Sequence, residues 1–160
     1  ARARSICAEM HSGYTALRSN CPMNIEADLA DAGALIWRDK PGVRADVARL
    51  EAMWTGLLQA HGGPMLFGAF TIADAFYAPV AFRIRTYGLD VGKGQAWVDH
   101  IIAHPAMQQW EAEALAESWR EAAADKGLTA LRGPILTSDS PAQVIQALRA
   151  AIAEQGRAAA

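Results

Sequence analysis

The chain has 160 residues, of which 52% are hydrophobic, and a formal net charge of -2 at pH 7. This length predicts one domain with a core of its own, and the charge gives no field that would attract nucleic acid or an anionic membrane. No apolar run is long enough to cross a bilayer, and abundant alanine with few β-branched residues favours helices over sheet.

The two cysteines, Cys7 and Cys21, show neither metal-site spacing nor a disulfide framework. We therefore expect a soluble, cytoplasmic protein with free thiols. The chain begins at Ala1 without an initiating methionine and with a helical pattern already under way. We expect that a segment upstream of this residue is missing.

Residues 1–20 have the spacing of one helix. Their apolar positions recur every three or four residues, which puts them on a single face. Gly13 lies within this stretch, where glycine costs about 1 kcal/mol relative to alanine, so we expect a close approach by another backbone or a ligand there. The pair Cys21-Pro22 ends or kinks the segment. The expected inward residues are Ile6, Met10, Tyr14 and Leu17.

The next segments carry a weak and then a strong helical pattern. Residues 27–37 could hold a short helix with Leu29, Ile36 and Trp37 inward. Residues 43–61 predict a longer helix, stopped by the Gly-Gly-Pro run that follows His61. Its expected inward stripe consists of Val47, Leu50, Trp54, Leu57 and Leu58.

The sequence predicts its central helix from Thr71 to Tyr87. Thr71 is a suitable N-cap, and the carboxylate of Asp74 can reach back to the Thr71 amide to complete a capping box. The residues that follow are apolar on all sides until Arg83, a pattern typical of a buried helix. Pro79 lies inside this run and is expected to bend the helix.

The later segments predict three more helices. Residues 96–103 form a short one, and Pro105 occupies the favoured first position of the next, which Gly127 would end. A full capping box at residues 140–143 begins the last helix, beyond a linker-like stretch at 128–137. The inward residues expected of the second helix are Met107, Trp110, Ala114 and Trp119, and those of the last are Val144, Ile145, Leu148 and Ile152.

The usual catalytic and metal-binding motifs are missing from this sequence. No G-x-S-x-G, P-loop or G-x-G-x-x-G pattern occurs. The four histidines do not form a ligand set, because only His100 and His104 could share a helix face and two ligands are too few for zinc. We expect no metal, and we expect the tryptophans and methionines to pack in the core.

Three stretches resemble the C-terminal helical domain of the glutathione transferase family. The run F-G-A-F-T-I-A-D-A at 67–75 is similar to the family's [ST]-x-x-D box with its hydrophobic flanks. The run E-M-H-S-G-Y at 9–14 is similar to the first helix of bacterial beta-class enzymes, and H-P-A-M-Q-Q-W at 104–110 is also family-like. The resemblance implies an all-α bundle of about six to seven helices, with this domain at 1–127 and a linker and extra helix at 128–160 packing on it.

The resemblance also implies glutathione as co-substrate. In the family, a thioredoxin-like N-terminal domain, absent from this sequence, binds the tripeptide and activates its thiol. The first helix of the C-terminal domain faces that site, which makes His11 and Ser12 candidate glutathione contacts. Beta-class enzymes have lysine where this chain has Ser12, so their chemistry does not transfer directly. The alternative is that His11 is a partly exposed histidine without a role.

The pocket for the electrophilic substrate would lie on the first and the central helices. The resemblance assigns it Met10, Tyr14, Arg18, Arg83, Thr86 and Tyr87. A cation at Arg83 could bind a substrate carboxylate, and zeta-class isomerases place an arginine a few residues further on. The alternative is that Arg83 pairs with a surface acid.

Taken together, the sequence predicts the C-terminal part of a bacterial, beta- or zeta-like glutathione transferase. The intact protein would conjugate glutathione to small electrophiles, or use it for isomerisation or reduction, and would be a homodimer. The chain alone should be inactive, because most transition-state stabilisation would lie on the missing domain. The alternative is a non-catalytic helical protein-interaction module, which the additional helix after Ser140 favours.

Overall fold

The computed structural model describes residues 1–118, and all regular elements in this part are helical apart from two isolated β-bridges within residues 65–69. The all-α fold predicted from composition is therefore confirmed. The predicted boundary at residue 127 and the helix after Ser140 lie outside the described residues. The elements are α1 (Arg2–Ser12), α2 (Thr15–Asn20), α3 (Ala30–Asp39), α4 (Pro41–His61), α5 (Ile72–Tyr87), the 3-10 helix η1 (Gly92–Gly94), α6 (Gln95–Ile102) and α7 (Pro105–Ala116).

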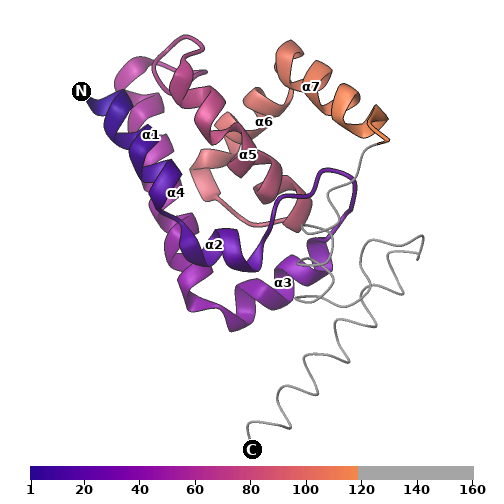
Figure 1. Cartoon of the computed structure of the whole chain (residues 1–160). Helices are drawn as coiled ribbons and strands as arrows, with labels where there is room; N and C mark the ends of the chain where they lie inside the picture. The colour runs from indigo at the N-terminus through magenta and orange to yellow at the C-terminus, as the bar shows by residue number, and fades with distance from the viewer. Residues whose placement is uncertain (119–160) are drawn as a thin grey trace, which may run out of the picture.

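The first predicted helix is divided in two, which corrects the expectation of one helix over residues 1–20. Gly13 is extended at φ -98° and ψ -168°, and Tyr14 is left-handed at φ 55° and ψ 38°. These two residues end α1 and turn the chain into α2 (Figure 1). Left-handed backbone is uncommon for a residue with a bulky side chain, so the contacts of Tyr14 must hold this turn in place.

Helix α5 begins at the predicted capping box. The Thr71 hydroxyl accepts a hydrogen bond from the Ala73 amide, and the Asp74 carboxylate accepts one from the Thr71 amide at 2.8 Å. Asp74 is fully buried, and its other oxygen accepts from the Leu66 amide and from the Trp97 indole, each at 3.0 Å. One carboxylate thus joins the start of α5 to the preceding loop and to α6.

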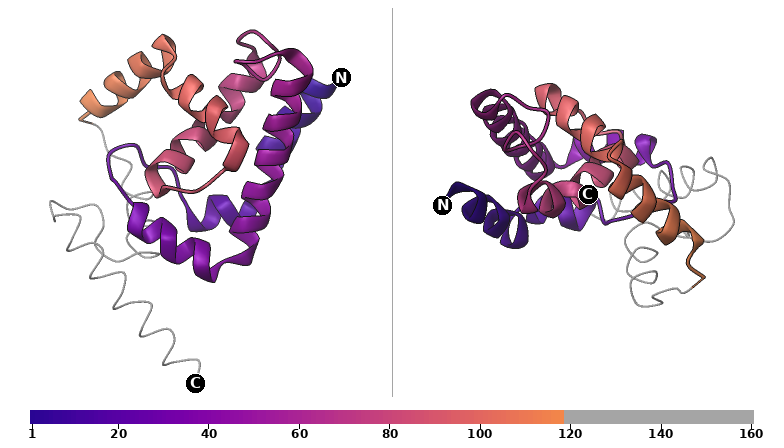
Figure 2. Two further views of the ribbon diagram at one scale, coloured as in Figure 1. Left: turned by 180° about the vertical axis from the view of Figure 1, so that it is seen from behind. Right: turned by 90° about the horizontal axis from the view of Figure 1, so that it is seen from above.

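The core lies around α5, with α1 and α4 on one side of it and α6 and α7 on the other (Figures 1 and 2). Helices α1, α3 and α6 make the direct helix contacts with α5. Trp54 of α4 is at its centre, with its ring centroid 5.9 Å from that of Tyr77 and 4.5 Å from that of Trp97. The α4 stripe predicted from the sequence faces this cluster, because Val47, Leu50, Trp54 and Leu57 are all at most 1% exposed.

One face of α5 is exposed, which corrects the expectation that this helix is buried on all sides. Ile72 is 63% exposed and Phe76 is 38% exposed. Pro79 and Arg83 follow at helical spacing and are half-buried, so these four residues form one stripe along the helix. The apolar residues near the start of α5 therefore serve both the core and the surface.

Helices α3 and α5 touch through their backbones at Gly33. A Cβ atom added to Gly33 would lie 1.7 Å from the carbonyl oxygen of Tyr87, far inside van der Waals contact. Leu29, which caps α3, donates from its amide to the Thr86 carbonyl at 2.8 Å. The sequence predicted Leu29 as an inward residue, and it is buried, whereas Ile36 and Trp37 are half-buried.

Helices α6 and α7 begin close to the predicted positions, with Pro105 at the first position of α7. The inward residues expected of α7 are corrected by the structure: α7 has no buried residue, and Trp110 is 43% exposed. Met107 is half-buried against the core. Helix α7 ends at Ala116, so Trp119 and Gly127 lie outside the described residues.

Candidate functional site

The end of α1 presents the residues expected near glutathione. His11 and Ser12 are exposed in its last turn, and Met10 is half-buried against the core. The Ser12 hydroxyl donates to the Ala8 carbonyl at 2.9 Å, a bond within the helix. The imidazole of His11 therefore stands at the surface where α1 ends, accessible to a group that approaches from solvent.

Arg18 of α2 folds back onto the end of α1. Its Nη1 donates to the carbonyl oxygen of His11 at 2.7 Å and is 3.5 Å from that of Met10. The last carbonyls of a helix lack partners within the helix, and a cation there also suits the helix dipole. Arg18 thus caps α1 and stays beside His11, although its side chain is exposed.

Arg83 lies on the exposed stripe of α5 and also bonds to carbonyl groups. Its Nε donates to the carbonyl oxygen of Cys21 at 3.0 Å, and its Nη1 to that of Pro79 at 3.2 Å. Among residues 1–118, Arg83 forms no ion pair. The expected alternative of a pairing with a surface acid is therefore not found in the described part. Burial, followed by the nearby charge of Arg18, lowers the pKa of Arg83.

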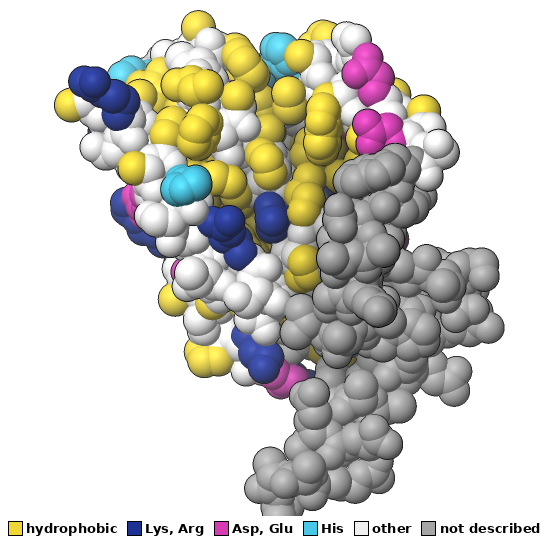
Figure 3. Space-filling view, viewed as in Figure 1, with side chains coloured by type: hydrophobic (Ala, Val, Ile, Leu, Met, Phe, Trp, Pro, Cys, Tyr) yellow, Lys and Arg dark blue, Asp and Glu magenta, His cyan; other side chains and the backbone are white. Residues whose placement is uncertain are grey.

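An apolar groove lies between α5 and α7, next to Arg83 along α5. We call it the α5–α7 groove; its volume is about 220 Å³. Figure 3 shows hydrophobic side chains gathered on the face where α5 runs between α1 and α7, with basic side chains along the lower edge of this area. The groove is lined by Ala75, Ala78, Pro79, Phe82, Met107 and Trp110.

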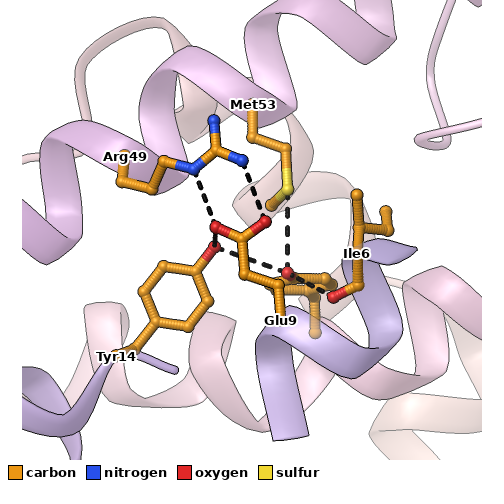
Figure 4. Close-up of polar contacts among 6 residues, drawn as sticks. Ile6, Glu9, Tyr14, Arg49 and Met53 are labelled. Carbon is orange, nitrogen blue, oxygen red and sulfur yellow. Dashed lines mark hydrogen bonds and ion pairs between the residues drawn. The ribbon is translucent and has the colours of Figure 1, made fainter. Parts of the chain in front are cut away.

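Tyr14 is buried at the turn between α1 and α2. Its hydroxyl donates to Glu9 Oε1 at 3.1 Å and lies 3.4 Å from the hydroxyl of Tyr77 (Figure 4). Glu9 in turn pairs with Arg49 of α4 through two hydrogen bonds of 2.7 and 2.8 Å. Since Tyr14 is only 6% exposed, its contacts fix the turn between α1 and α2.

Tyr77 completes this network in the core. Its hydroxyl lies 2.8 Å from the carbonyl oxygen of Ile6, to which it donates, and 3.6 Å from the sulfur of Met53. Burial raises the pKa of Tyr77 to about 12, and burial followed by the bond with Tyr77 raises the pKa of Tyr14 further. Both phenols therefore stay protonated at neutral pH, so neither is suited to activate a thiol as a tyrosinate.

Thr86 and Tyr87 lie in the interior, away from the exposed stripe of α5. Thr86 is 4% exposed and Tyr87 is 0% exposed. The Thr86 hydroxyl donates to the Asn24 carbonyl at 2.6 Å, and the Tyr87 hydroxyl donates to the Pro22 carbonyl at 3.1 Å. These bonds attach the loop between α2 and α3 to the end of α5, and in this structure neither hydroxyl faces solvent.

The structure thus brings His11, Arg18 and Arg83 to one corner, where α1, α2 and α5 meet. Sequence reasoning missed the α5–α7 groove, because it assigned Trp110 to the core. It also missed Tyr77. This residue follows Asp74 by three positions, a spacing that places both on the inner face of α5 and could have indicated a buried hydroxyl group. Within residues 1–118, no group of three or more His, Cys, Asp or Glu side chains could hold a metal ion, and no helix is long and apolar enough to span a membrane.

Comparison with known proteins gives one family. The model of the glutathione S-transferase C-terminal domain matches residues 25–113, more than half of the chain. No curated protein and no solved structure matches the sequence significantly. The match includes α3 to α6 and most of α7, with Arg83 and the groove, whereas α1 and α2 with His11 and Arg18 precede it. The chain belongs to the glutathione S-transferase C-terminal domain family.

Proposed function

We propose that this chain forms the electrophile-binding side of a glutathione transferase active site. The observation that carries the proposal is the open face of α5, where an apolar groove and two arginines adjoin the exposed end of α1. An apolar surface with a few convergent polar groups is typical of a small-molecule site. Family membership makes glutathione the expected co-substrate.

The thiol-activating side of the site would come from a thioredoxin-like domain that precedes this chain. Among the described residues, both tyrosines near the corner have raised pKa values, and both cysteines are buried. None of these groups is placed to lower the pKa of a bound thiol. We infer that the intact protein is a bacterial, beta- or zeta-like, cytoplasmic homodimer that acts by conjugation, isomerisation or reduction, and that this chain alone is inactive.

Within this site we assign His11 a hydrogen bond to the glutathione thiolate. Its position at the exposed end of α1 leaves the imidazole free to donate. Ser12 lies beside it and remains a candidate contact to the tripeptide. Met10 and the α5–α7 groove would contact the apolar part of the electrophile, while Tyr14, Thr86 and Tyr87 would hold these elements in place from the interior.

The experiment joins the upstream thioredoxin-like domain to this chain and measures conjugation of glutathione to a chloronitrobenzene. We expect the joined protein to be active and the chain alone to show no activity. His11→Ala should lower turnover about tenfold, the value of one hydrogen bond to a charged group. His100→Ala, an exposed histidine of α6, is the matched control. Equal turnover of the two variants would exclude our role for His11.

The second candidate is a non-catalytic interaction module. It is favoured by the exposed apolar residues at the start of α5, because exposed apolar patches often mark protein interfaces. These residues are Phe70, Ile72 and Phe76, at 42%, 63% and 38% exposure. If the joined protein neither binds nor conjugates glutathione, this candidate replaces the transferase.

A further inference from the structure

A cavity of about 560 Å³ lies where the last turn of α5 meets α6 and the start of α7. We call it the α5–α6 cavity. Its floor is apolar and belongs to the core, because Ile84, Leu89 and Val98 are each at most 4% exposed. Its rim is polar and includes the exposed residues Gln95 and Asp99. An apolar cavity of this size with a few convergent polar groups is typical of a small-molecule site.

The α5–α6 cavity is separate from the site proposed above. Ile84 and Arg85 point about 100° and 200° around α5 from Arg83, which lies on the exposed stripe. Arg85 lines the cavity, and its guanidinium carbon lies 4.6 Å from the ring centroid of Phe82, which lines the α5–α7 groove. Arg85 also pairs with Glu111 of α7. This ion pair therefore stands between the cavity and the groove, so a ligand in one does not occupy the other.

The carboxylate of Asp99 is the unmatched charge of the cavity lining. The other charged lining residue, Arg85, donates to both carboxylate oxygens of Glu111, whereas none of the ion pairs of residues 1–118 includes Asp99. Asp99 Oδ1 accepts a hydrogen bond of 2.7 Å from Gln95 Nε2, one turn earlier on α6. Within the described part of the chain Asp99 Oδ2 and Gln95 Oε1 accept none, so two unused acceptors adjoin each other at the rim.

The backbone amides at the ends of the helices around the cavity are already used. An anion bound at a helix end needs free N–H groups, but four lining residues each donate from the amide to a carbonyl oxygen of this chain at 3.0–3.1 Å: Gly88, Leu89, Ala103 and Gln108. The last carbonyls of a helix also carry a partial negative charge, and α5 ends at the cavity. The α5–α6 cavity therefore favours a cation with hydrogen-bond donors over an anion.

Two other cavities of the described residues lack this combination. The α5–α7 groove, of about 220 Å³, has no ionisable lining residue, and a cavity of about 370 Å³ between the end of α4 and α6 has His100 as its titratable lining residue. Exposed acids elsewhere, such as Asp31 and Asp90, line none of the three. Asp99 is therefore distinguished by its position at the rim of an apolar cavity, and not by its exposure alone.

We propose that the α5–α6 cavity binds a small organic amine, whose ammonium group donates to Asp99 and Gln95 and whose apolar body lies on the floor of the cavity. An ammonium group carries several donors, which suits two adjacent acceptors, and its hydrogen bond to a carboxylate is stronger than one between neutral groups. The apolar body adds affinity through the surface that it buries. This binding site goes beyond the proposed transferase function and does not depend on it.

The test is a calorimetric titration of the full 160-residue chain at neutral pH and low salt with 4-phenylbutylamine. The comparison ligands are 4-phenyl-1-butanol, which has the same body without the charge, and 4-phenylbutyrate, which has the opposite charge. The amine should bind about tenfold more tightly than the alcohol, the value of one charge-assisted hydrogen bond, and the acid should bind more weakly than either. Equal affinity for amine and alcohol, or tighter binding of the acid, would overturn the proposal.

Four variants assign the binding to this cavity. Asp99→Asn should lower the affinity for the amine to that for the alcohol, whereas Asp31→Asn, at an exposed carboxylate of α3, is the matched control and should keep the preference. Ala103→Trp places a large side chain at an exposed lining position and should weaken the amine and the alcohol together. Trp110→Ala, in the α5–α7 groove, should change neither. Equal losses in the two aspartate variants, or a loss with Trp110→Ala, would show that the amine binds elsewhere.

A readout on the wild-type chain covers the case in which a variant fails to fold. The side-chain NH2 NMR signals of Gln95 and Gln108, which line the cavity, should shift on addition of 4-phenylbutylamine. Those of Gln109, whose amide is bonded to Glu113 along α7, should not. Absence of the two shifts, or an equal shift of Gln109, would overturn the amine site.

The same titration separates this inference from the proposed function. The ring signals of His11 should stay unchanged when the amine binds, because the cavity and the end of α1 lie on different sides of α5. A shift of His11 would place the amine in the proposed transferase site and overturn the separate cavity site. A joined protein that conjugates nothing but still binds the amine would reject the transferase proposal and leave this inference standing.

Discussion

The hydroxyl of Tyr77 in α5 donates a hydrogen bond of 2.8 Å to the carbonyl oxygen of Ile6 in α1, 71 residues earlier in the chain. Both residues are buried, so the bond joins the two helices inside the core. Tyr14 lies 3.4 Å from the same hydroxyl, which adds the turn between α1 and α2 to the contact. The orientation of α1, and with it that of His11, therefore depends on the core.

Tyr77→Phe should lower the free energy of unfolding by about 1–2 kcal/mol, because it removes a buried hydrogen bond without changing the packing volume. Urea unfolding followed by tryptophan fluorescence measures this change. The double variant with Tyr14→Phe should lose less than the sum of the two single variants, since the two hydroxyl groups share one network. Additive losses would show that the tyrosines act independently.

Asp74→Asn should lower the free energy of unfolding by about 3 kcal/mol. All of the groups that approach this buried carboxylate are donors, from Leu66, Thr71 and Trp97. In the asparagine variant, a side-chain NH2 group would replace one carboxylate oxygen. It would face these donors without accepting from them, so buried donors would lose their partner. Thermal unfolding provides the measurement, and Asp99→Asn, at an exposed carboxylate bonded to Gln95, is the control. A similar Tm for both variants would contradict this account of the box.

Substitution of two helical glycines should have opposite effects. Gly33→Ala should destabilise the protein by about 3 kcal/mol or more, because the new Cβ would meet the Tyr87 backbone and push α3 away from α5. Gly56→Ala in α4 should stabilise it by about 1 kcal/mol, since nothing lies within 4 Å of its Cβ position and alanine favours the helix. Chemical unfolding of the two variants measures both changes in the free energy of unfolding. A stabilised Gly33→Ala would show that α3 and α5 do not touch at this position.

The Glu9–Arg49 pair predicts a small pH dependence. The hydrogen bond from Arg49 lowers the pKa of Glu9 from its ordinary value of 4.5. Because the folded pKa is the lower one, the pair stabilises the protein above pH 4.5 and the gain is lost as the pH falls through the folded pKa. The side chain of Arg49 is 55% exposed, so solvent screening keeps the gain below about 1 kcal/mol.

Unfolding of wild type and Glu9→Gln at a series of pH values measures this effect. The two stabilities should differ at pH 7 and converge as the pH falls below 4.5, the ordinary value for Glu9. Added salt should reduce the difference at pH 7. A difference that persists at low pH would assign the effect to packing and not to charge.

The sequence predicted the helices whose signals are local. The capping box at Thr71 and Asp74 gave the start of α5, and the apolar stripe of α4 gave its buried face. The break at Gly13 and Tyr14 was not predicted, because the spacing of apolar residues continues across it and only tertiary contacts favour the left-handed turn. The exposed face of α5 was not predicted for a related reason: an apolar residue such as Phe76 has the same pattern whether it faces the core or a groove.

The candidate site was predicted only in part. The resemblance to the family pointed to His11, Arg18 and Arg83, and the structure brings them to one corner. The resemblance did not distinguish these three residues from Thr86 and Tyr87, which are buried. Neighbouring positions on a helix point in different directions, and a hydroxyl group is as common in a pocket as in the core. Their partners, the carbonyls of Asn24 and Pro22, lie more than 60 positions away in the chain.

The left-handed backbone of Tyr14 has a consequence for ligand recognition. In an uninterrupted helix, residues seven positions apart are separated by about 10 Å along the axis, whereas the Arg18 guanidinium reaches the His11 carbonyl at 2.7 Å. The extended backbone of Gly13 and the left-handed backbone of Tyr14, at φ 55°, together place the Arg18 guanidinium at the end of α1 that carries His11. Tyr14 would then affect which substrate binds through the turn that it forms, without contacting the substrate itself.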